Sequence, residues 1–189
     1  MSSPIGSKRN VKIFVLYLME NINYPLEFST LNDIVMQTDY VMYLDFAEAF
    51  HEMLDMELII EIDDGNNNKY YAVSEKGRCV AEELHSDILS SILDQSLACA
   101  LRYLDFKKRG IEGHCSSQRR PDGRYDVTCT FTEKKPGQQG ERTVIFTTTL
   151  AVDSENRAER MKKNFMERPD VIYRGVIALL SGNVNFLFD

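Results

Sequence analysis

Lysine and arginine are missing from residues 13–68 of this 189-residue chain. Residues 1–86 hold 15 acidic and 6 basic side chains, a net charge of −9, whereas residues 87–189 hold 14 acidic and 16 basic side chains, a net charge of +2. The two values sum to the whole-chain charge of −7. Because proteins bind nucleic acid mainly by neutralising phosphates with Lys and Arg, this distribution argues against a DNA-binding surface in the first half.

Other absences narrow the class of protein. No apolar run approaches the roughly 18 residues of a membrane span, and the N-terminal MSSPIGSKRN has no apolar segment before its basic residues, so we expect neither a membrane segment nor a signal peptide. None of the four cysteines forms a CxxC pair, which favours free buried thiols over a zinc site or a disulfide framework. We therefore expect a globular, cytoplasmic protein.

Residues 28–77 carry the clearest structural pattern, two short amphipathic helices followed by two strands. The first helix begins near Thr30, which forms a capping-box pattern with Asp33. The second has one apolar stripe, made of Phe46, Phe50, Met53 and Leu54. Residues 58–62 and 69–73 are predicted strands joined by a Gly/Asn turn at 64–68, and Ser74 is the predicted cap of the next helix.

The segment HEMLDMELIIEIDDGNNNKYYAVSEKG resembles the recognition helix, wing and following helix of bacterial winged-helix regulators. These commonly read L-x-x-L-x-x-x-G-L-I … Y-Y-x-L-T-x-x-G, and the shared positions are Met53-Leu54, Leu58-Ile59, Tyr70-Tyr71 and Ser74-Glu75-Lys76-Gly77. Glu57 stands where the pattern has the glycine that ends the helix, and a non-glycine residue there is strained if it adopts a left-handed conformation. The whole chain is similar to an uncharacterised bacterial family of winged-helix proteins. The resemblance implies a winged helix-turn-helix domain and a role in transcription regulation.

The rest of the first half is predicted from pattern alone. Residues 1–9 are expected to form a disordered, slightly basic tail, and Asn10 is the expected N-cap of an apolar helix that ends at 21–25. After the second strand we expect helices at 75–85 and 87–108. The apolar stripe of the second of these is expected to cover the following sheet or to pair with its counterpart in a dimer.

The second half reads as a three-stranded antiparallel sheet, residues 111–152, with one apolar and one threonine-rich face. Asp153-Ser154 caps a polar helix at 155–167, a second helix runs from Pro169 to Gly182, and 184–188 form an apolar end that is tied down or paired. The predicted fold class is α+β, with a winged-helix domain at 1–86 and an α/β domain at 87–189.

Two sets of residues are candidates for binding. DNA contacts would come from the N-terminal cations, the head of the second helix and the wing, namely Lys8, Arg9, Lys12, Tyr40, Tyr43, Asn66, Asn67, Asn68 and Lys69. Core packing of the tyrosines and a solvated turn at the wing are the alternatives. The predicted recognition helix instead carries acidic residues that repel phosphate and suit a basic protein, namely Asp45, Glu48, Glu52 and Asp55.

We therefore carry two hypotheses. The first is a dimeric transcriptional regulator that touches DNA through its wing and N-terminal cations. The second is a winged-helix protein-interaction module that does not bind DNA directly, with a basic protein or a second copy as partner. We find no catalytic motif and expect neither an enzyme nor a cofactor.

Weaker features of the second half have ordinary alternatives. His114, Cys115 and Cys129 can approach across two strands, but a metal site needs three or four ligands in a suitable geometry, and an exposed histidine beside two core cysteines explains them as well. A basic set can bind an acidic partner or be a solvated surface; it comprises Lys107, Lys108, Arg109, Arg119, Arg120 and Arg124. The threonine face can bind a small molecule or face solvent.

Overall fold

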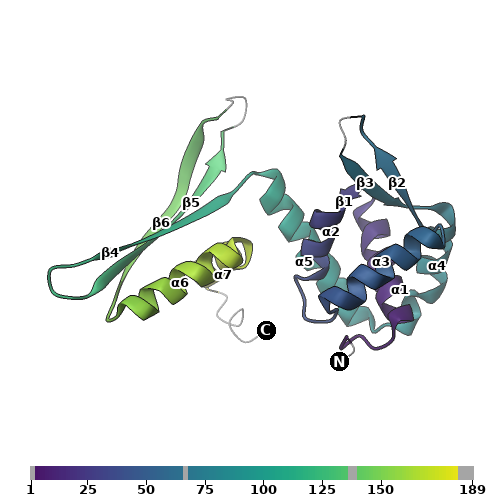
Figure 1. The fold of residues 1–189 in the computed structure, drawn as a ribbon, viewed down its shortest axis with the longest axis horizontal. Helices are drawn as coiled ribbons and strands as arrows, with labels where there is room; N and C mark the ends of the chain where they lie inside the picture. The colour runs from purple at the N-terminus through teal and green to yellow at the C-terminus, as the bar shows by residue number, and fades with distance from the viewer. Residues whose placement is uncertain (1–2, 66–67, 136–139, 183–189) are drawn as a thin grey trace. The chain divides into compact units, whose positions relative to one another are not determined.

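The computed structural model describes residues 3–65, 68–135 and 140–182, which form seven α-helices, one 3₁₀ turn and two three-stranded antiparallel sheets (Figure 1). The predicted α+β class is confirmed. The chain divides into two compact units, Met1–Leu104 and Asp105–Asp189. No helix in the described ranges is both long and apolar enough to cross a membrane.

The N-terminal unit alternates helices and short strands. Its elements are α1 (Lys8–Ile22), β1 (Leu26–Glu27), α2 (Phe28–Val35), α3 (Tyr43–Asp55), β2 (Ile59–Asp63), β3 (Lys69–Val73), α4 (Glu75–Leu84), a 3₁₀ turn (His85–Asp87) and most of α5 (Ser90–Lys108). The strands lie in the order β1-β3-β2, so the returning strand is central. The predicted strands at 58–62 and 69–73 and the predicted helix beginning after Ser74 are confirmed within one residue.

The core of this unit explains why its elements form. Helix α1 is apolar nearly all round and is buried along most of its length. An aromatic cluster joins α2, α3 and β3, since the ring of Phe50 lies 4.8 Å from those of both Phe28 and Tyr71. Phe46 and Met53, which lie on the same stripe of α3 as Phe50, are fully buried. The stripe therefore fixes which face of α3 points outward.

Helix α5 packs differently from the prediction. Its stripe was expected to cover the second sheet or to form a dimer contact, but Ile88, Leu93 and Ala100 are buried in the same core as α1 to α3. Polar contacts agree, because the Tyr103 hydroxyl donates to Asp33 at 2.6 Å and the Tyr40 hydroxyl donates to Gln95 at 3.1 Å. An apolar stripe shows that a face is buried without showing against which element. The division after Leu104 thus lies later than the predicted boundary at residue 86.

The N-terminal predictions need two corrections. The predicted disordered tail is ordered from Ser3, which is 3% exposed, and the amide of Ile5 donates to the Tyr40 carbonyl at 3.0 Å. Helix α1 is capped by Ser7, whose side chain accepts from the Asn10 amide, while the Asn10 side chain donates to the Ile5 carbonyl. Asn10 is therefore not the N-cap, because the packed segment before it brings Ser7 to that position.

The predicted capping box of Thr30 and Asp33 is also wrong. Helix α2 begins at Phe28, its N-cap is Glu27 without a side-chain bond, and Thr30 is buried inside the helix. Residue Glu27 pairs with Tyr70 in the sheet immediately before the helix begins. The strand thus fixes the entry of the chain into α2, and no capping side chain is needed.

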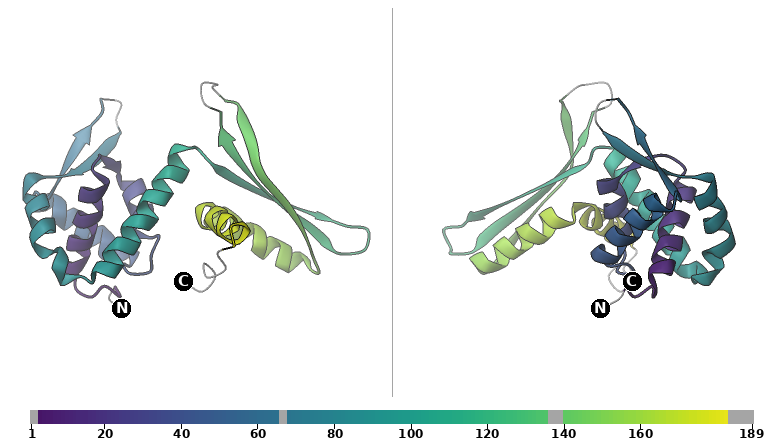
Figure 2. Two further views of the ribbon diagram at one scale, coloured as in Figure 1. Left: turned by 180° about the vertical axis from the view of Figure 1, so that it is seen from behind. Right: turned by 45° about the vertical axis from the view of Figure 1, so that its right-hand side comes forward.

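The C-terminal unit is the predicted meander followed by two helices. Strands β4 (Glu112–Arg119), β5 (Tyr125–Lys134) and β6 (Arg142–Val152) lie in the order β4-β5-β6, and α6 (Glu155–Glu167) and α7 (Pro169–Leu180) follow. Figure 2 shows α6 running along one face of this sheet. Ser154 is the N-cap of α6 by position, although its side chain makes no capping hydrogen bond. The predicted apolar end at 184–188 lies outside the described residues.

The two faces of the second sheet differ as predicted. Val127, Cys129 and Phe131 are buried on one face, where the ring of Phe131 lies 4.8 Å from that of Phe165 in α6. On the other face the hydroxyls of Thr128 and Thr149 lie 3.0 Å apart. The threonine side chains thus satisfy one another across the strands.

Buried thiols are confirmed for only half of the cysteines. Cys115 and Cys129 are buried and directly opposite each other on β4 and β5, with their Sγ atoms 3.2 Å apart. Cys79 is exposed and Cys99 is half-buried. A helical pattern places a cysteine on a helix but does not by itself bury it, which is why the prediction fails for these two.

Candidate functional site

The outward side of α3 is the candidate site. Helix geometry puts residues four and seven positions apart on the same side, and the exposed Leu44, Glu48, His51 and Asp55 follow this spacing opposite the buried stripe. Tyr43 borders them and is 54% exposed, and Leu44 is 71% exposed. We call these five residues the α3 face.

The N-terminal segment around Ser3 packs against the first turn of α3. Asp45 accepts a hydrogen bond from the Ser3 amide at 2.8 Å, and the Ser3 hydroxyl accepts from the amide of Met42, the N-cap of α3, at 2.8 Å. The Ser3 hydroxyl also donates to Asp45, and the hydrogen bonds from the Ser3 hydroxyl and the Ser3 amide lower the pKa of the Asp45 carboxyl below its ordinary value. Asp45, predicted to bind a partner, therefore holds the chain's own N-terminus.

The cations predicted to bind DNA lie against acidic residues. Lys8 is paired with Glu48, the Lys12 ammonium lies 2.9 Å from Glu52, and the Arg9 guanidinium lies 2.8 Å from Asp87. The hydrogen bond from Lys12 lowers the pKa of Glu52, and the one to Glu48 raises the pKa of Lys8. Two of these three cations thus meet acids predicted to bind a partner.

The β2–β3 hairpin is also internally paired. The Lys69 ammonium lies 2.9 Å from Glu61, which raises the pKa of Lys69, and the Asn68 side chain donates to Asp64 at 3.0 Å. Asn66 and Asn67, the other predicted wing contacts, lie outside the described residues. Of the two predicted tyrosines, Tyr40 is packed against the core and bonded to Gln95, whereas Tyr43 is exposed.

The remaining basic residues of 3–86 also form a hydrogen bond or an ion pair within the N-terminal unit. Lys76 donates to the Met56 carbonyl at 2.8 Å, and Arg78 lies 2.9 Å from Glu20. Asp55, in contrast, makes no ion pair or hydrogen bond within the described ranges. The α3 face therefore has an excess of negative charge close to exposed apolar side chains.

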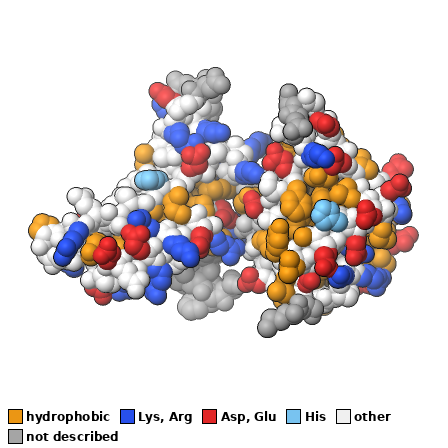
Figure 3. Space-filling model, in the orientation of Figure 1, with side chains coloured by type: hydrophobic (Ala, Val, Ile, Leu, Met, Phe, Trp, Pro, Cys, Tyr) orange, Lys and Arg blue, Asp and Glu red, His pale blue; other side chains and the backbone are white. Residues whose placement is uncertain are grey.

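Pattern reasoning missed the apolar character of this region. Large apolar side chains around α3 and β2 are exposed, namely Met42, Leu44, Met56, Ile60 and Ile62. In Figure 3 hydrophobic side chains gather over the N-terminal unit next to acidic ones. One signal was available, because Leu44 lies off the stripe formed by Phe46, Phe50 and Met53. An apolar residue on the polar side of an amphipathic helix often marks a contact surface.

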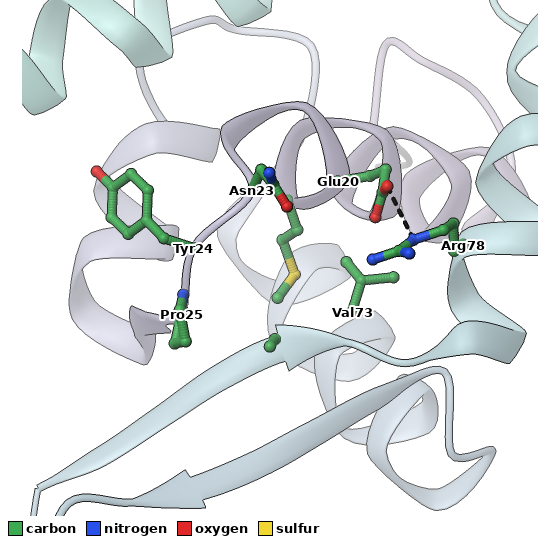
Figure 4. Close-up of a pocket in the computed structure, with 8 residues that line it drawn as sticks. Glu20, Asn23, Tyr24, Pro25, Val73 and Arg78 are labelled. Carbon is green, nitrogen blue, oxygen red and sulfur yellow. Dashed lines mark ion pairs between the residues drawn. The ribbon is translucent and has the colours of Figure 1, made fainter.

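A small pocket lies elsewhere on this unit, between the end of α1, β3 and α4 (Figure 4). Its volume is about 190 Å³, and the ion pair between Glu20 and Arg78 crosses one side of it. Pockets that bind small molecules are usually larger, roughly 300–1,000 Å³. We assign no ligand to it.

The geometry also separates the residues weighed as metal ligands. Cys115 lies on the buried face, and the neighbouring His114, which is exposed, points to the opposite face because side chains alternate along a strand. The described residues contain no group of three or more potential ligands. Within the predicted basic set, Arg109 is held by Glu133 at 2.7 Å and Arg124 by Asp122 at 2.7 Å.

Comparison with known proteins gives a family without a known function. No curated protein matches the chain significantly, and no solved structure does. A family model matches residues 11–180, which is nearly the whole chain, and the protein therefore belongs to the family described as Domain of unknown function (DUF4364).

Proposed function

We propose that the N-terminal unit is a winged-helix protein-interaction module, whose α3 face binds a protein segment with basic and apolar side chains. The element order α1-β1-α2-α3-β2-β3 and the strand order β1-β3-β2 support the winged-helix interpretation. The β2–β3 hairpin takes the place of the wing, and α3 takes that of the recognition helix.

The exposure of Leu44 beside Asp55 carries this proposal. Burying a leucine side chain contributes about 1.5–3 kcal/mol, so a partner that covers Leu44 gains affinity that a phosphate backbone cannot provide. Tyr43 adds an exposed aromatic side chain, a residue type that is enriched among the strongest contributors to protein interfaces. Asp55, which makes no ion pair among the described residues, favours a partner with lysine or arginine around its apolar anchor.

Charge weighs against direct DNA binding by this face. Each surface ion pair is worth at most about 1 kcal/mol, so DNA can displace Lys8, Lys12 or Lys69 from its acid. The displaced acid stays next to the DNA and repels its phosphates, however, and the net charge of residues 1–86 remains −9. A regulatory role in transcription fits the same geometry when a bound protein, and not this unit, contacts DNA.

Photo-crosslinking in the native host tests the proposal. A photoreactive amino acid replaces Leu44 in one variant and Leu89 in a control, and both leucines are 71% exposed in the N-terminal unit. We expect one reproducible protein crosslink from position 44 and none from position 89. The position-44 crosslink should be lost on Asp55→Lys, which reverses the charge at residue 55 without touching the core. Equal crosslinking from both positions would contradict the proposal.

A DNA-binding measurement decides between the two hypotheses. The purified chain is mixed with random-sequence and own-promoter duplexes at about 50 and 200 mM salt, a range over which phosphate-mediated binding falls steeply. We expect no binding at either concentration. Binding at the lower salt that is lost on Lys69→Glu would instead establish a DNA-binding regulator that uses its β2–β3 hairpin.

A further inference from the structure

Strand β6 is one of the two edge strands of the second sheet. Within residues 3–65, 68–135 and 140–182 it pairs with β5 alone, and with 11 residues it is the longest of the strands described. Proteins usually protect an edge strand with charged residues, proline or a covering element, because its unpaired amides and carbonyls bind other strands. Between Thr143 and Val152, β6 has no charged residue and no proline.

The opposite edge is protected in the ordinary way. Strand β4 carries Glu112, His114 and Arg119, and α6 packs along it. On β6, in contrast, Val144 is 60% exposed and Leu150 is 49% exposed, although Leu150 lies opposite the fully buried Val127. Among the described residues, charged side chains and α6 thus protect the β4 edge, whereas Thr143–Val152 of β6 lacks charged residues and proline.

An irregularity divides β6 into two parts. The pairing with β5 shifts between Phe131 and Thr132, so that Phe131 lies opposite Phe146 and Thr132 lies opposite Val144. A bulge of this kind bends a strand and interrupts pairing. Beyond it, Phe146–Val152 pairs with β5 without a shift. Seven residues at about 3.4 Å each give a straight edge about 24 Å long.

We propose that two copies of the chain associate through this edge, with Phe146–Val152 of each copy paired antiparallel around a twofold axis at Thr149. In this register Phe146 lies opposite Val152 of the second copy, Thr148 opposite Leu150, Thr147 opposite Ala151, and Thr149 opposite itself. The two sheets become one sheet of six strands.

Self-complementarity and the absence of charge point to a second copy as the occupant. A twofold axis perpendicular to the sheet keeps each face continuous, so Phe146, Thr148, Leu150 and Val152 of both copies line the apolar face, and threonines and alanines meet on the other. No charged side chain opposes another within the paired segment, which removes the usual electrostatic obstacle to pairing like strands. The exposed side of Leu150 is covered by a neighbour from the second copy.

The expected strength follows from the size of the contact. Stable interfaces bury about 800 Å² on each partner, and one pair of seven-residue strands lies at or below the lower end of that range. The dimer should therefore be reversible and depend on protein concentration. This association involves only the C-terminal unit and is independent of the function proposed for the α3 face.

Engineered disulfides test the contact and its register. Thr149→Cys places two cysteines opposite each other across the axis, where Cα atoms in an antiparallel pair are about 4.5–5.5 Å apart, within the range of a disulfide. The half-buried and exposed native cysteines are first replaced through Cys79→Ser and Cys99→Ser. We expect mild oxidation to link Thr149→Cys into a covalent dimer and to leave the control Thr143→Cys, on the same strand before the bulge, unlinked.

Sedimentation of the unmodified chain gives a second measurement. We expect a dimer that dissociates on dilution, and at least a tenfold weaker association for Thr149→Lys, which opposes two ammonium groups at the axis, but not for Thr143→Lys. Circular dichroism confirms that both lysine variants are folded. A chain that is monomeric at every concentration would overturn the proposal, and a covalent dimer from Thr147→Cys in place of Thr149→Cys would overturn the register.

Discussion

Gly77 lies against the carbonyl oxygen of Leu58 so closely that a Cβ atom on residue 77 would fall 2.0 Å from that oxygen. Ser74 reinforces the contact, because its amide donates to the Leu58 carbonyl at 3.0 Å and its hydroxyl donates to the Glu57 carbonyl at 2.7 Å. The Gly77 amide donates in turn to the Ser74 hydroxyl oxygen at 3.0 Å. The start of α4 is thereby fixed to the turn between α3 and β2.

Gly77→Ala should therefore destabilise the N-terminal unit. The added methyl group must push α4 away from the backbone at Leu58, and overpacking of this kind costs about 1–3 kcal/mol. Urea unfolding followed by circular dichroism measures the loss in the free energy of unfolding. Cys79→Ala is the matched control, since Cys79 is exposed on the same helix and its replacement should change stability by less than about 0.5 kcal/mol. Equal stability of the two variants would contradict the contact.

Glu57→Gly should have the opposite effect. Glu57 adopts φ +56°, so the strain predicted from its place in the pattern is confirmed. A left-handed conformation costs a non-glycine residue about 1–2 kcal/mol, which glycine avoids. Because glycine also loses more conformational entropy on folding, part of this gain in stability is offset. We expect the free energy of unfolding to rise by up to about 1 kcal/mol. Glu57→Ala removes the same side chain and keeps the strain, so it should not stabilise; if it matches Glu57→Gly, strain is not the cause.

The sequence predicted most elements of the fold because each carries its own periodic pattern. The stripe of Phe46, Phe50 and Met53 identifies α3 and its buried face, and the alternation of Val127, Cys129 and Phe131 with threonines identifies β5 and its two faces. Such patterns depend on residues within one element. They state which side of the element is buried and leave its partner open.

Several of the misses depend on contacts between distant residues. The α5 stripe packs on the first core, Ser3 reaches Asp45 across 42 positions, and Lys12 reaches Glu52 across 40. A pattern within one helix or strand cannot show which residues so far apart in the sequence come into contact. For the same reason, the sequence did not show that the cations predicted to bind DNA are paired with the acids predicted to bind a partner.

The contact between Ser3 and Asp45 should make the N-terminal unit sensitive to acid. Hydrogen bonds hold the pKa of Asp45 below its ordinary value of 3.8, and Lys12 holds that of Glu52 below 4.5. A carboxyl with a lowered folded-state pKa adds stability above its unfolded pKa and loses it as pH falls through the folded value. We expect the free energy of unfolding to fall as pH drops below about 4.5, the unfolded-state range of these carboxyls.

Ser3→Ala isolates this contribution. Removing the hydroxyl takes away one hydrogen bond to Asp45 and the acceptor for the Met42 amide, so the variant should be less stable at neutral pH and should lose less stability on acidification. Denaturant titrations at several pH values measure both effects. Ser86→Ala, at an exposed serine of the same unit, should follow the unmodified chain. An unchanged pH dependence in Ser3→Ala would show that Asp45 does not depend on the N-terminal segment.

The reactivity of the buried cysteines should report the stability of the C-terminal unit independently of the N-terminal unit. Burial raises the pKa of Cys129 to about 12, and the neighbouring Cys115 adds to the shift. Because the thiolate is the reacting form, Cys129 should resist a disulfide reagent at pH 8 in the folded chain, while the exposed Cys79 reacts at once.

Cys79→Ser should remove the fast phase of the reaction, and denaturant should make the buried Cys115 and Cys129 reactive only as the sheet unfolds. Since reaction then requires opening of the C-terminal unit, its rate measures the stability of that unit, and Gly77→Ala should leave it unchanged. Rapid labelling of Cys129 in the folded chain would show that the core around Phe131 is open to solvent.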